Sequence, residues 1–397
     1  MKVGVLYYRW DYYPYTRTIL HQVPGVTYLP VHDFYSTLNR VVQKVNRSAG
    51  RTLFPHFDLN NQFQDFGLNG VDLLHFFNGI SYGKTPWVSN FETMLPRLSG
   101  LLAQYNQRLD ELRPDRRAQC ALDALSSDAC KQLVALSGCT RSIQLDLLQR
   151  LPFDTQAIQR KLTVLHPPQE KMIADYDEKG LDLAGPIRFI LVGAGFFRKG
   201  GREILRVFEH LVRQQHYPIE LVIVSSLRMD HYAAHETEAD VAWAQETIAA
   251  NRDWITHHPS LPNDQVLALM RSAHVGLLPT YADTYGYSVL ECQAQGTPVI
   301  STNVRALPEL NNEQAGWLIE VPRDDLGEGL YATPEQRALL SAAIEAGLER
   351  ALHEIFADRA SLRRKGIAAL ARIQQQHDPA RYKQRLGEIY AQALKTV

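Results

Sequence analysis

Residues 190–211 read ILVGAGFFRKGGREILRVFEHL and place three kinds of local structure in series. An apolar, strand-like run comes first, a glycine-rich loop follows, and apolar residues at helical spacing come last. Glycine lets the backbone approach a ligand closely, and N–H groups at a helix start attract anions. The stretch therefore predicts a phosphate-binding turn between a strand and a helix, with Lys199 as a cation beside a diphosphate. The glycines that we expect at the ligand are Gly193, Gly195 and Gly200.

The same alternation of strand and helix continues on both sides of this stretch. Short apolar runs occur at 2–8, 26–31, 71–77, 86–91, 133–137 and 162–166, and again at 187–195, 219–226, 253–258, 275–279 and 297–302. Runs of this kind suit parallel strands that helices cover on both faces. We expect an α/β protein with two doubly wound, Rossmann-like domains facing an interdomain cleft, and ligands at the carboxyl ends of the strands.

A polar stretch with proline and glycine at 167–186 separates the two sets of runs and resembles an interdomain hinge. We place an acceptor-binding domain at 1–180 and a nucleotide-sugar-binding domain at 181–375. Helical spacing near the end of the chain predicts a final helix at 376–397 that packs back on the first domain.

Composition excludes several classes of protein. Lys and Arg total 42 against 43 Asp and Glu, so the chain has no overall field that attracts nucleic acid. No apolar run approaches the roughly 20 residues that span a bilayer, and Met1 leads directly into a strand-like run, so we expect a cytoplasmic protein. The four cysteines lack zinc-ligand spacing, and we predict no metal site.

A second stretch with chemical character is YADTYGYSVLECQAQGTPVIST at 281–302. If a helix begins near Gly286, Asp283 lies in the loop before it and Glu291 one to two turns inside, so both carboxylates can face one cleft. Carboxylates are good acceptors for vicinal hydroxyl groups. The backbone N–H groups of Tyr285, Gly286 and Tyr287 are then expected to serve a phosphate.

These two stretches together resemble the glycosyltransferases of the GT-B fold, and most closely the retaining family 4, the glycosyl transferases group 1. In that family an acidic residue, seven further residues and a glutamate precede a turn of the form G-x-P-V-I. Asp283, Glu291 and residues 296–300 match this order, although the first acid is usually the longer glutamate. The family's phosphate loop carries an arginine where this chain has Ala194, and the neighbouring Arg198 is a candidate replacement.

The resemblance implies roles for particular residues. Lys199 would contact the diphosphate, Asp283 the donor sugar and Glu291 the ribose, while the backbone from His258 to Leu261 would meet the base. Glu92 stands where many members of the family have a catalytic-site histidine. The resemblance further implies transfer of a hexose with retention, a UDP- or GDP-sugar donor, no cofactor and no metal ion.

Two other functions remain open from the sequence. A nucleotide-sugar epimerase of the same fold would use a similar donor cleft but no separate acceptor. A non-catalytic sugar-nucleotide-binding protein is the other, because Ala194 and Asp283 both depart from the family's pattern. The hydroxyl acceptor, whether a glycan, a lipid-linked glycan or a small molecule, is not named by the sequence.

Three further stretches carry weaker signals. The aromatic segment 7–17 suggests alternate rings in the core and the remainder at an acceptor groove. The basic segment 38–51 fits either a solvated helix, the more common case, or a peripheral contact with the inner face of a membrane. The Asp-Tyr-Asp sequence at 175–177 resembles a metal-binding motif but lies in the hinge, where such spacing arises by chance. We assign no histidine, His75 included, as a catalytic base.

Overall fold

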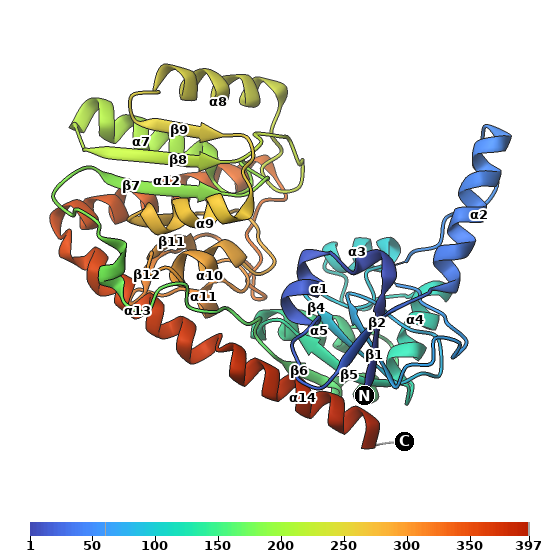
Figure 1. Cartoon of the computed structure of the whole chain (residues 1–397). Coiled ribbons are helices and arrows are strands. Elements are labelled where there is room, and N and C mark those ends of the chain that lie inside the picture. The colour runs from blue at the N-terminus through green and yellow to red at the C-terminus, as the bar shows by residue number, and fades with distance from the viewer. Residues whose placement is uncertain (60, 396–397) are drawn as a thin grey trace. The chain divides into compact units, whose positions relative to one another are not determined.

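The chain folds into two compact units in a computed structural model that describes residues 1–59 and 61–395 (Figure 1). Unit 1 comprises Met1–Pro168 and the chain from Pro379 onward, and unit 2 comprises Gln169–Asp378. Each unit contains one six-stranded sheet in which every paired strand runs parallel to its neighbour. The predicted α/β class with two doubly wound sheets is confirmed.

Unit 1 has the strand order β2-β1-β3-β4-β5-β6. Its strands are β1 (Lys2–Leu6), β2 (Thr27–Val31), β3 (Leu73–Phe77), β4 (Trp87–Phe91), β5 (Cys130–Ala135) and β6 (Leu162–Val164). Its helices are η1 (Tyr7–Arg9), α1 (Tyr13–Thr18), α2 (Phe34–Ala49), α3 (Ser99–Asn106), α4 (Arg116–Ser126), α5 (Gly138–Gln149), α6 (Gln156–Gln159) and α14 (Pro379–Lys395). Strands β3 and β4 are almost wholly buried, which explains why their sequences are nearly continuous apolar runs.

Helix α14 completes the core of unit 1. Tyr382, Leu386 and Tyr390 follow one another at four-residue spacing, so they lie on one face of the helix. This face packs in the same core cluster as Val3 of β1 and Leu73 of β3. Full burial of a leucine side chain contributes about 2 kcal/mol to stability, so α14 is an integral part of unit 1.

Unit 2 has the strand order β12-β11-β10-β7-β8-β9. Its strands are β7 (Ile187–Val192), β8 (Ile219–Val224), β9 (Ile255–His258), β10 (Val275–Leu278), β11 (Val299–Thr302) and β12 (Gly316–Ile319). Its helices are η2 (Tyr176–Lys179), α7 (Gly201–Gln215), α8 (Glu238–Ala250), α9 (Asn263–Ser272), α10 (Tyr287–Gln293), α11 (Leu307–Leu310), α12 (Pro334–Ala357) and α13 (Ala360–Gln376). Strand β12, which the sequence did not predict, is a four-residue edge strand that begins with glycine.

The boundary between the units differs from the predicted position at 180. Residues 169–180 belong to unit 2 because they pack on it: Ile173 and Tyr176 are buried in a cluster with Leu370 of α13. The Met172 N–H also donates to the Ala294 carbonyl at 2.8 Å. The polar stretch that resembled a free hinge is thus largely an ordered strap on unit 2.

Candidate functional site

The sheet of unit 2 has a topological switch point between β7 and β10. The chain passes from β7 to β8 on one side of the sheet and later returns to β10 on the other side. The loops that follow β7 and β10, at 193–200 and 279–286, therefore diverge at the carboxyl ends of neighbouring strands. Ligands of doubly wound folds bind at this position. Both chemically distinctive stretches of the sequence end in these two loops.

The loop after β7 is a tight turn whose glycines are required by close packing. Gly200 precedes α7 with a φ of 79°, and a Cβ there would lie 2.2 Å from the Pro279 carbonyl oxygen. Gly193 has a φ of 139°, and a Cβ there would lie 2.3 Å from Cε of Lys199. Glycine at these positions lets the loop approach β10 and lets Lys199 fold back over the turn.

The loop's own hydrogen bonds correct one expectation. The N–H groups of Lys199, Gly200 and Gly201 donate to carbonyls within the loop, at 2.9, 3.0 and 2.9 Å. The N–H group of Gly201, the first residue of α7, is thus already paired within the protein, whereas the sequence predicted that N–H groups at this helix start would be free for a phosphate. The Lys199 side chain remains the group in this loop that is best suited to an anion.

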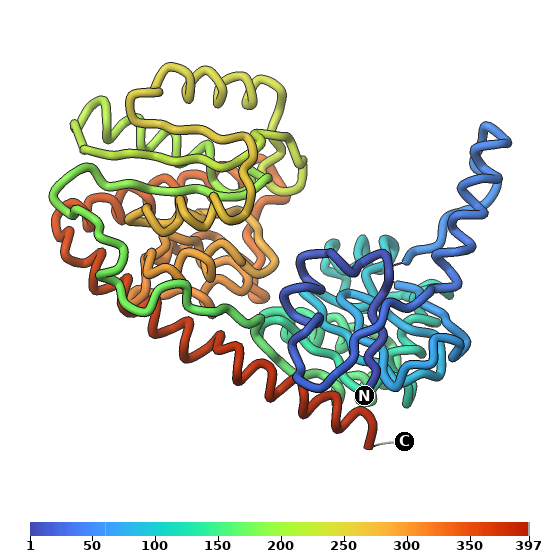
Figure 2. Tube along the Cα trace, in the orientation of Figure 1, coloured from blue at the N-terminus to red at the C-terminus, as the bar shows by residue number. Residues whose placement is uncertain are grey.

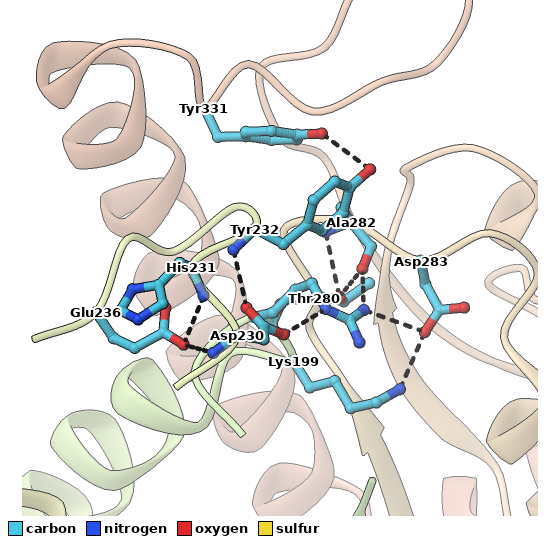
Figure 3. Close-up of polar contacts among 10 residues, drawn as sticks. Lys199, Asp230, His231, Tyr232, Glu236, Thr280, Ala282, Asp283 and Tyr331 are labelled. Carbon is cyan, nitrogen blue, oxygen red and sulfur yellow. Dashed lines mark hydrogen bonds and ion pairs between the residues drawn. The ribbon is translucent and has the colours of Figure 1, made fainter. Parts of the chain in front are cut away.

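Lys199 and Asp283 form an ion pair that joins the two loops (Figure 3). Lys199 Nζ lies 3.0 Å from Asp283 Oδ2, and the two side chains are only 12% and 14% exposed. Burial tends to raise the pKa of Asp283, but the Lys199 ammonium, with Arg198 beside it, holds that pKa below its ordinary value. Asp283 is thus ionised, and its carboxylate points at Lys199, the cation predicted to contact the diphosphate.

Arg198 links three loops rather than standing free as a second phosphate ligand. Its Nε donates to Asp230 Oδ2 at 2.9 Å, and one terminal nitrogen donates to the Ala282 carbonyl at 2.7 Å. The same nitrogen lies 3.9 Å from Asp283 Oδ2. Two cations and two carboxylates thus meet at the switch point, so the site is close to charge balance.

The backbone of Arg198 binds the opposite loop as well. Its carbonyl accepts hydrogen bonds from the Tyr281 N–H at 2.8 Å and the Thr280 hydroxyl at 2.9 Å. Tyr281 is held in turn by Glu203 of α7. The buried Glu203 carboxylate accepts a hydrogen bond from the Tyr281 hydroxyl at 2.7 Å and one from the Ser341 hydroxyl at 2.6 Å. These contacts fix the loop that carries Asp283 against the loop that carries Lys199.

The start of α10 follows the predicted position. The helix begins at Tyr287 after Gly286, which has a φ of 98°, and Glu291 lies half-buried one turn further on. The Tyr285 N–H donates to Asp283 Oδ1 at 3.2 Å, so it is engaged, not open to a phosphate as expected. This bond makes Asp283 the residue that shapes the turn into α10.

The predicted base-binding stretch lies at the end of β9, beside a cavity of about 600 Å³. Leu227, His257 and Pro259 are among the residues that line this cavity, whereas His258 and Leu261 are not. The His258 carbonyl accepts the Ser225 N–H at 3.0 Å. Of the predicted stretch only Pro259 lines this cavity, and α8 and β9 supply most of the other lining residues, so the contact with the base stays a prediction.

Glu92 belongs to unit 1 and follows β4. Its carboxylate accepts a hydrogen bond from the Asn78 amide at 3.2 Å and pairs with Arg97 at 3.3 Å. Asn78 follows β3, and its side-chain oxygen accepts a hydrogen bond from the Glu92 N–H at 3.2 Å. The geometry ties two strand ends together, and the catalytic role of Glu92 stays a prediction.

The Asp-Tyr-Asp sequence has a local structural use. Asp175 caps η2 in a reciprocal arrangement with Glu178, and Asp177 makes a two-pronged ion pair with Arg363 at 3.0 and 2.8 Å. Residues 1–59 and 61–395 contain no group of three acidic, histidine or cysteine side chains placed to hold a metal ion. The same residues include no helix long and apolar enough to cross a membrane.

Asp230 and Glu203 belong to this site but were not predicted from the sequence. Asp230 lies in the loop after β8, near Tyr232, whose hydroxyl meets that of Tyr331 at 3.4 Å (Figure 3). No periodicity or motif marks this loop. Glu203 resembles an ordinary acid in the first turn of a helix, where acids are common. Only its burial in the structure separates it from a surface residue.

Comparison with known proteins agrees with this arrangement. Residues 174–350 match the family described as glycosyl transferases group 1. The D-inositol 3-phosphate glycosyltransferase of Paenarthrobacter aurescens (strain TC1) is 23% identical over 328 residues, which cover 78% of this chain and 72% of that protein. Another protein of that name, from Arthrobacter sp. (strain FB24), is 33% identical over 102 residues, or 24% of either chain.

Solved structures share the fold at low sequence identity. Sucrose-phosphate synthase from Thermosynechococcus elongatus has a TM-score of 0.55 and 17% identity, covering 95% of this chain and 83% of its own. Anabaena HepE in complex with UDP has a TM-score of 0.54 and 13% identity, covering 92% and 86%. The predicted GT-B fold is confirmed, and so is the predicted similarity to the glycosyl transferases group 1, which residues 174–350 of unit 2 carry; the chain is a glycosyltransferase.

Proposed function

We propose that this glycosyltransferase transfers a hexose from a nucleoside diphosphate sugar to a hydroxyl acceptor with retention of anomeric configuration. The observation that supports this most directly is the Lys199–Asp283 ion pair at the switch point of unit 2. It sets a cation for the diphosphate beside a carboxylate for sugar hydroxyls. Both groups are largely shielded from water, which strengthens their electrostatic effect.

The remaining donor contacts follow from position. Glu291 on α10 would accept the ribose hydroxyls, and the stretch from His258 to Leu261 would meet the base. UDP is the preferred nucleotide of this proposal, because the related structure of Anabaena HepE is described in complex with UDP and with UDP-glucose. GDP remains the second choice, and a panel of UDP-, GDP-, ADP- and TDP-sugars in thermal-shift experiments distinguishes them, since bound ligand raises stability.

The near balance of charge at the Lys199–Asp283 pair also affects how strongly the site binds a diphosphate before and during the reaction. A diphosphate that approaches Lys199 also approaches the carboxylate that already pairs with it, so ground-state binding gains little from net charge. As the bond from the anomeric carbon to the phosphate oxygen breaks, negative charge grows on the leaving diphosphate. Lys199 then stabilises the transition state more than the bound donor.

Retention needs no protein nucleophile in this proposal. The acceptor oxygen bonds to the anomeric carbon on the face from which the diphosphate departs. The acceptor proton passes to the departing phosphate oxygen, so charge and atoms balance. Product analysis of the anomeric configuration by NMR tests the stereochemistry, and an inverted product would exclude it.

Metal independence is part of the same proposal, because Lys199 supplies a cation at the diphosphate. We expect turnover to be unchanged in excess EDTA. The measurement is the initial rate of sugar transfer before and after chelation, with a metal-dependent glycosyltransferase as the control. Loss of activity that Mg²⁺ or Mn²⁺ restores would contradict the expectation.

Incubation with donor alone tests the epimerase alternative, which no comparison favours. We expect slow hydrolysis of the donor and no epimer. An epimer formed without acceptor would show that the protein is an epimerase. Donor binding without turnover across a wide set of acceptors would indicate a non-catalytic binding protein.

A further inference from the structure

A helical arm without a core of its own extends from unit 1. The arm consists of residues 34–57: helix α2 and the segment that returns beside it (Figure 2). Asn39 and Asn46, seven residues apart on one face of α2, exchange hydrogen bonds with the backbone of Phe57 and Phe54 in the return segment. Two side chains thus hold the return segment against the helix.

Most of this arm is exposed. Between residues 40 and 56 only Val42 and Asn46 are half-buried, and all the others are exposed. Isolated helices of this length are marginal in water, and most helical stability in proteins comes from packing of an apolar face. The arm therefore has an apolar face available for a partner.

Three exposed apolar side chains and the half-buried Leu38 form a stripe along the arm. Phe34, Leu38, Val41 and Val45 recur at spacings of four, three and four, which places them on one face of α2. Phe34, Val41 and Val45 are 44%, 53% and 36% exposed. Exposed Leu53 and Phe54 of the return segment and Phe66, whose ring packs on Phe34 at 5.2 Å, add to the apolar surface of this region.

The charge of the arm has one sign. No Asp or Glu occurs between Asp33 and Asp58, whereas the whole chain has a net charge of −1. The basic side chains in this interval are Arg40, Lys44, Arg47 and Arg51, all exposed. At about 100° per residue on the helix, Lys44 flanks the apolar stripe, whereas Arg40 and Arg47 lie towards the opposite, polar face, as is usual for helices that lie in a membrane interface.

This combination selects among partners. A second copy of the arm would bring two segments together that carry only positive formal charge, which repel each other. A nucleic acid would pair with the basic residues but would leave the valines and phenylalanines in water. An anionic lipid surface accepts both features, because aliphatic and aromatic groups enter the boundary of the acyl chains while Lys and Arg contact the headgroups.

We propose that the arm of residues 34–57 docks the protein on anionic lipid bilayers, with Val41 and Val45 in the interface and Lys44, Arg47 and Arg51 at the headgroups. The proposal is independent of the donor and of the stereochemistry of transfer. It gives the protein a route to lipid-bound hydroxyl acceptors, but binding to vesicles is its direct consequence.

The first test is flotation of the full-length protein with vesicles. We expect binding to vesicles of phosphatidylcholine mixed with phosphatidylglycerol and none to phosphatidylcholine alone. The triple variant Lys44→Gln, Arg47→Gln, Arg51→Gln should lower partitioning on the order of a hundredfold, at roughly 1 kcal/mol for each basic residue. The control Lys84→Gln, Arg113→Gln, Arg116→Gln removes the same charge from exposed sites of unit 1 outside the arm and should bind nearly as the parent protein does.

The second test separates lipid binding from general attraction to polyanions. The variant Val41→Ser, Val45→Ser keeps every charge and should lower partitioning on the order of tenfold because two apolar side chains no longer enter the interface. Thermal unfolding and donor binding should be unchanged in both arm variants, since these side chains are exposed.

Three results would overturn the proposal. Unaltered vesicle binding by the valine variant would assign the arm to polyanions such as nucleic acid. If the parent protein is a dimer in sedimentation equilibrium and the valine variant is a monomer, the stripe binds a second copy of the chain. Equal loss of binding in the arm triple variant and its control would show that total charge, not the arm, attracts the vesicles.

Discussion

The two sheets have the same kind of switch point but different chemistry at it. In unit 2 the loops after β7 and β10 meet through the Lys199–Asp283 ion pair. In unit 1 the chain passes from β1 to β2 on one side and to β3 on the other. There the segment after β1 carries aromatic and polar contacts: the Tyr8 hydroxyl donates to Asp33 at 3.4 Å, and the Arg9 guanidinium lies 4.4 Å from the Tyr12 ring centre.

This difference explains why the sequence indicates a ligand class at the switch point of unit 2 but not at that of unit 1. A diphosphate requires cations and close backbone approach, and the proposed diphosphate site of unit 2 has glycines and charges at a set spacing that supplies them. An aromatic segment serves a core and a sugar-binding surface equally well. The structure shows that Tyr15 is buried while Tyr12 and Tyr13 are exposed, so the expected alternation of buried rings is wrong. The topology marks a position in each unit, and the residue chemistry identifies a ligand class in unit 2 alone.

The largest effect is expected from Lys199→Ala in unit 2. Turnover should fall on the order of a hundredfold or more, because a preorganised cation at the developing charge is lost. The variant also leaves the largely buried Asp283 without its main partner, so some stability should be lost as well. Steady-state kinetics and thermal unfolding measure the two losses separately.

A double variant, Lys199→Ala with Asp283→Asn, sharpens that result. It should regain stability relative to Lys199→Ala because no unpaired carboxylate remains, but it should not regain turnover. Recovery of turnover in the double variant would show that the lysine serves only to neutralise Asp283. Arg198→Ala is the companion measurement, and a loss confined to stability would fit its bonds to Asp230 and Ala282.

Unit 1 is expected to be the more sensitive to acid because of His75. Its ring is fully buried: Nδ1 lies 2.6 Å from the Tyr390 hydroxyl of α14 and Nε2 lies 3.0 Å from Asn90 Oδ1. Burial lowers the pKa of His75 from 6.5 to about 4. The folded protein therefore binds fewer protons than the unfolded chain between these values, so stability is present above pH 6.5 and is lost as the pH falls towards 4.

The difference between those pKa values corresponds to about 3 kcal/mol at the acid end. Chemical denaturation at a series of pH values, followed by a probe in unit 1, measures the slope. His75→Gln removes the titrating group and should flatten that slope even if its absolute stability is lower. An equal slope in the variant would assign the acid sensitivity to other groups.

A smaller effect is expected from Asp283→Asn. Turnover should fall roughly thirtyfold, since a charged acceptor for sugar hydroxyls becomes a neutral amide. The nucleoside diphosphate itself should bind more tightly, because Lys199 is no longer neutralised by its partner. Opposite changes in turnover and diphosphate affinity, by kinetics and calorimetry, are the signature. A decrease in both turnover and diphosphate affinity would show that Asp283 does not weaken diphosphate binding by neutralising Lys199.

The smallest of these effects is expected from Glu291→Gln. Donor affinity should fall roughly tenfold, because the amide cannot reproduce charge-assisted bonds to two ribose hydroxyls. Turnover at saturating donor should be nearly unchanged. The control is Glu238→Gln, an exposed acid in the first turn of α8, which should leave donor affinity as it is. Donor affinity that Glu291→Gln does not alter would take this residue out of the donor site.

Much of the proposed donor site could be predicted from the sequence, because its parts lie at strand ends. Asp283 and Lys199 are far apart in the chain, yet both follow parallel strands, and carboxyl ends of such strands share one edge of a sheet. Asp230 follows β8 at the same edge, but its loop carries no glycine or motif that distinguishes it from a connection. Its pairing with Arg198 depends on loop conformation, which short-range sequence does not encode.

The sequence by itself determined the two parallel α/β sheets, the similarity to the glycosyl transferases group 1 and the positions of the two loops of the proposed donor site, because each rests on local periodicity or on spacing within one stretch. Tertiary structure alone decided how the charges are shared: Lys199 with Asp283, Arg198 with Asp230, and His75 with Tyr390 of α14. It also assigned residues 169–180 to unit 2 through the burial of Ile173 and Tyr176. Pairing and burial join residues distant in the chain, and the free energies involved arise only when packing excludes water from them.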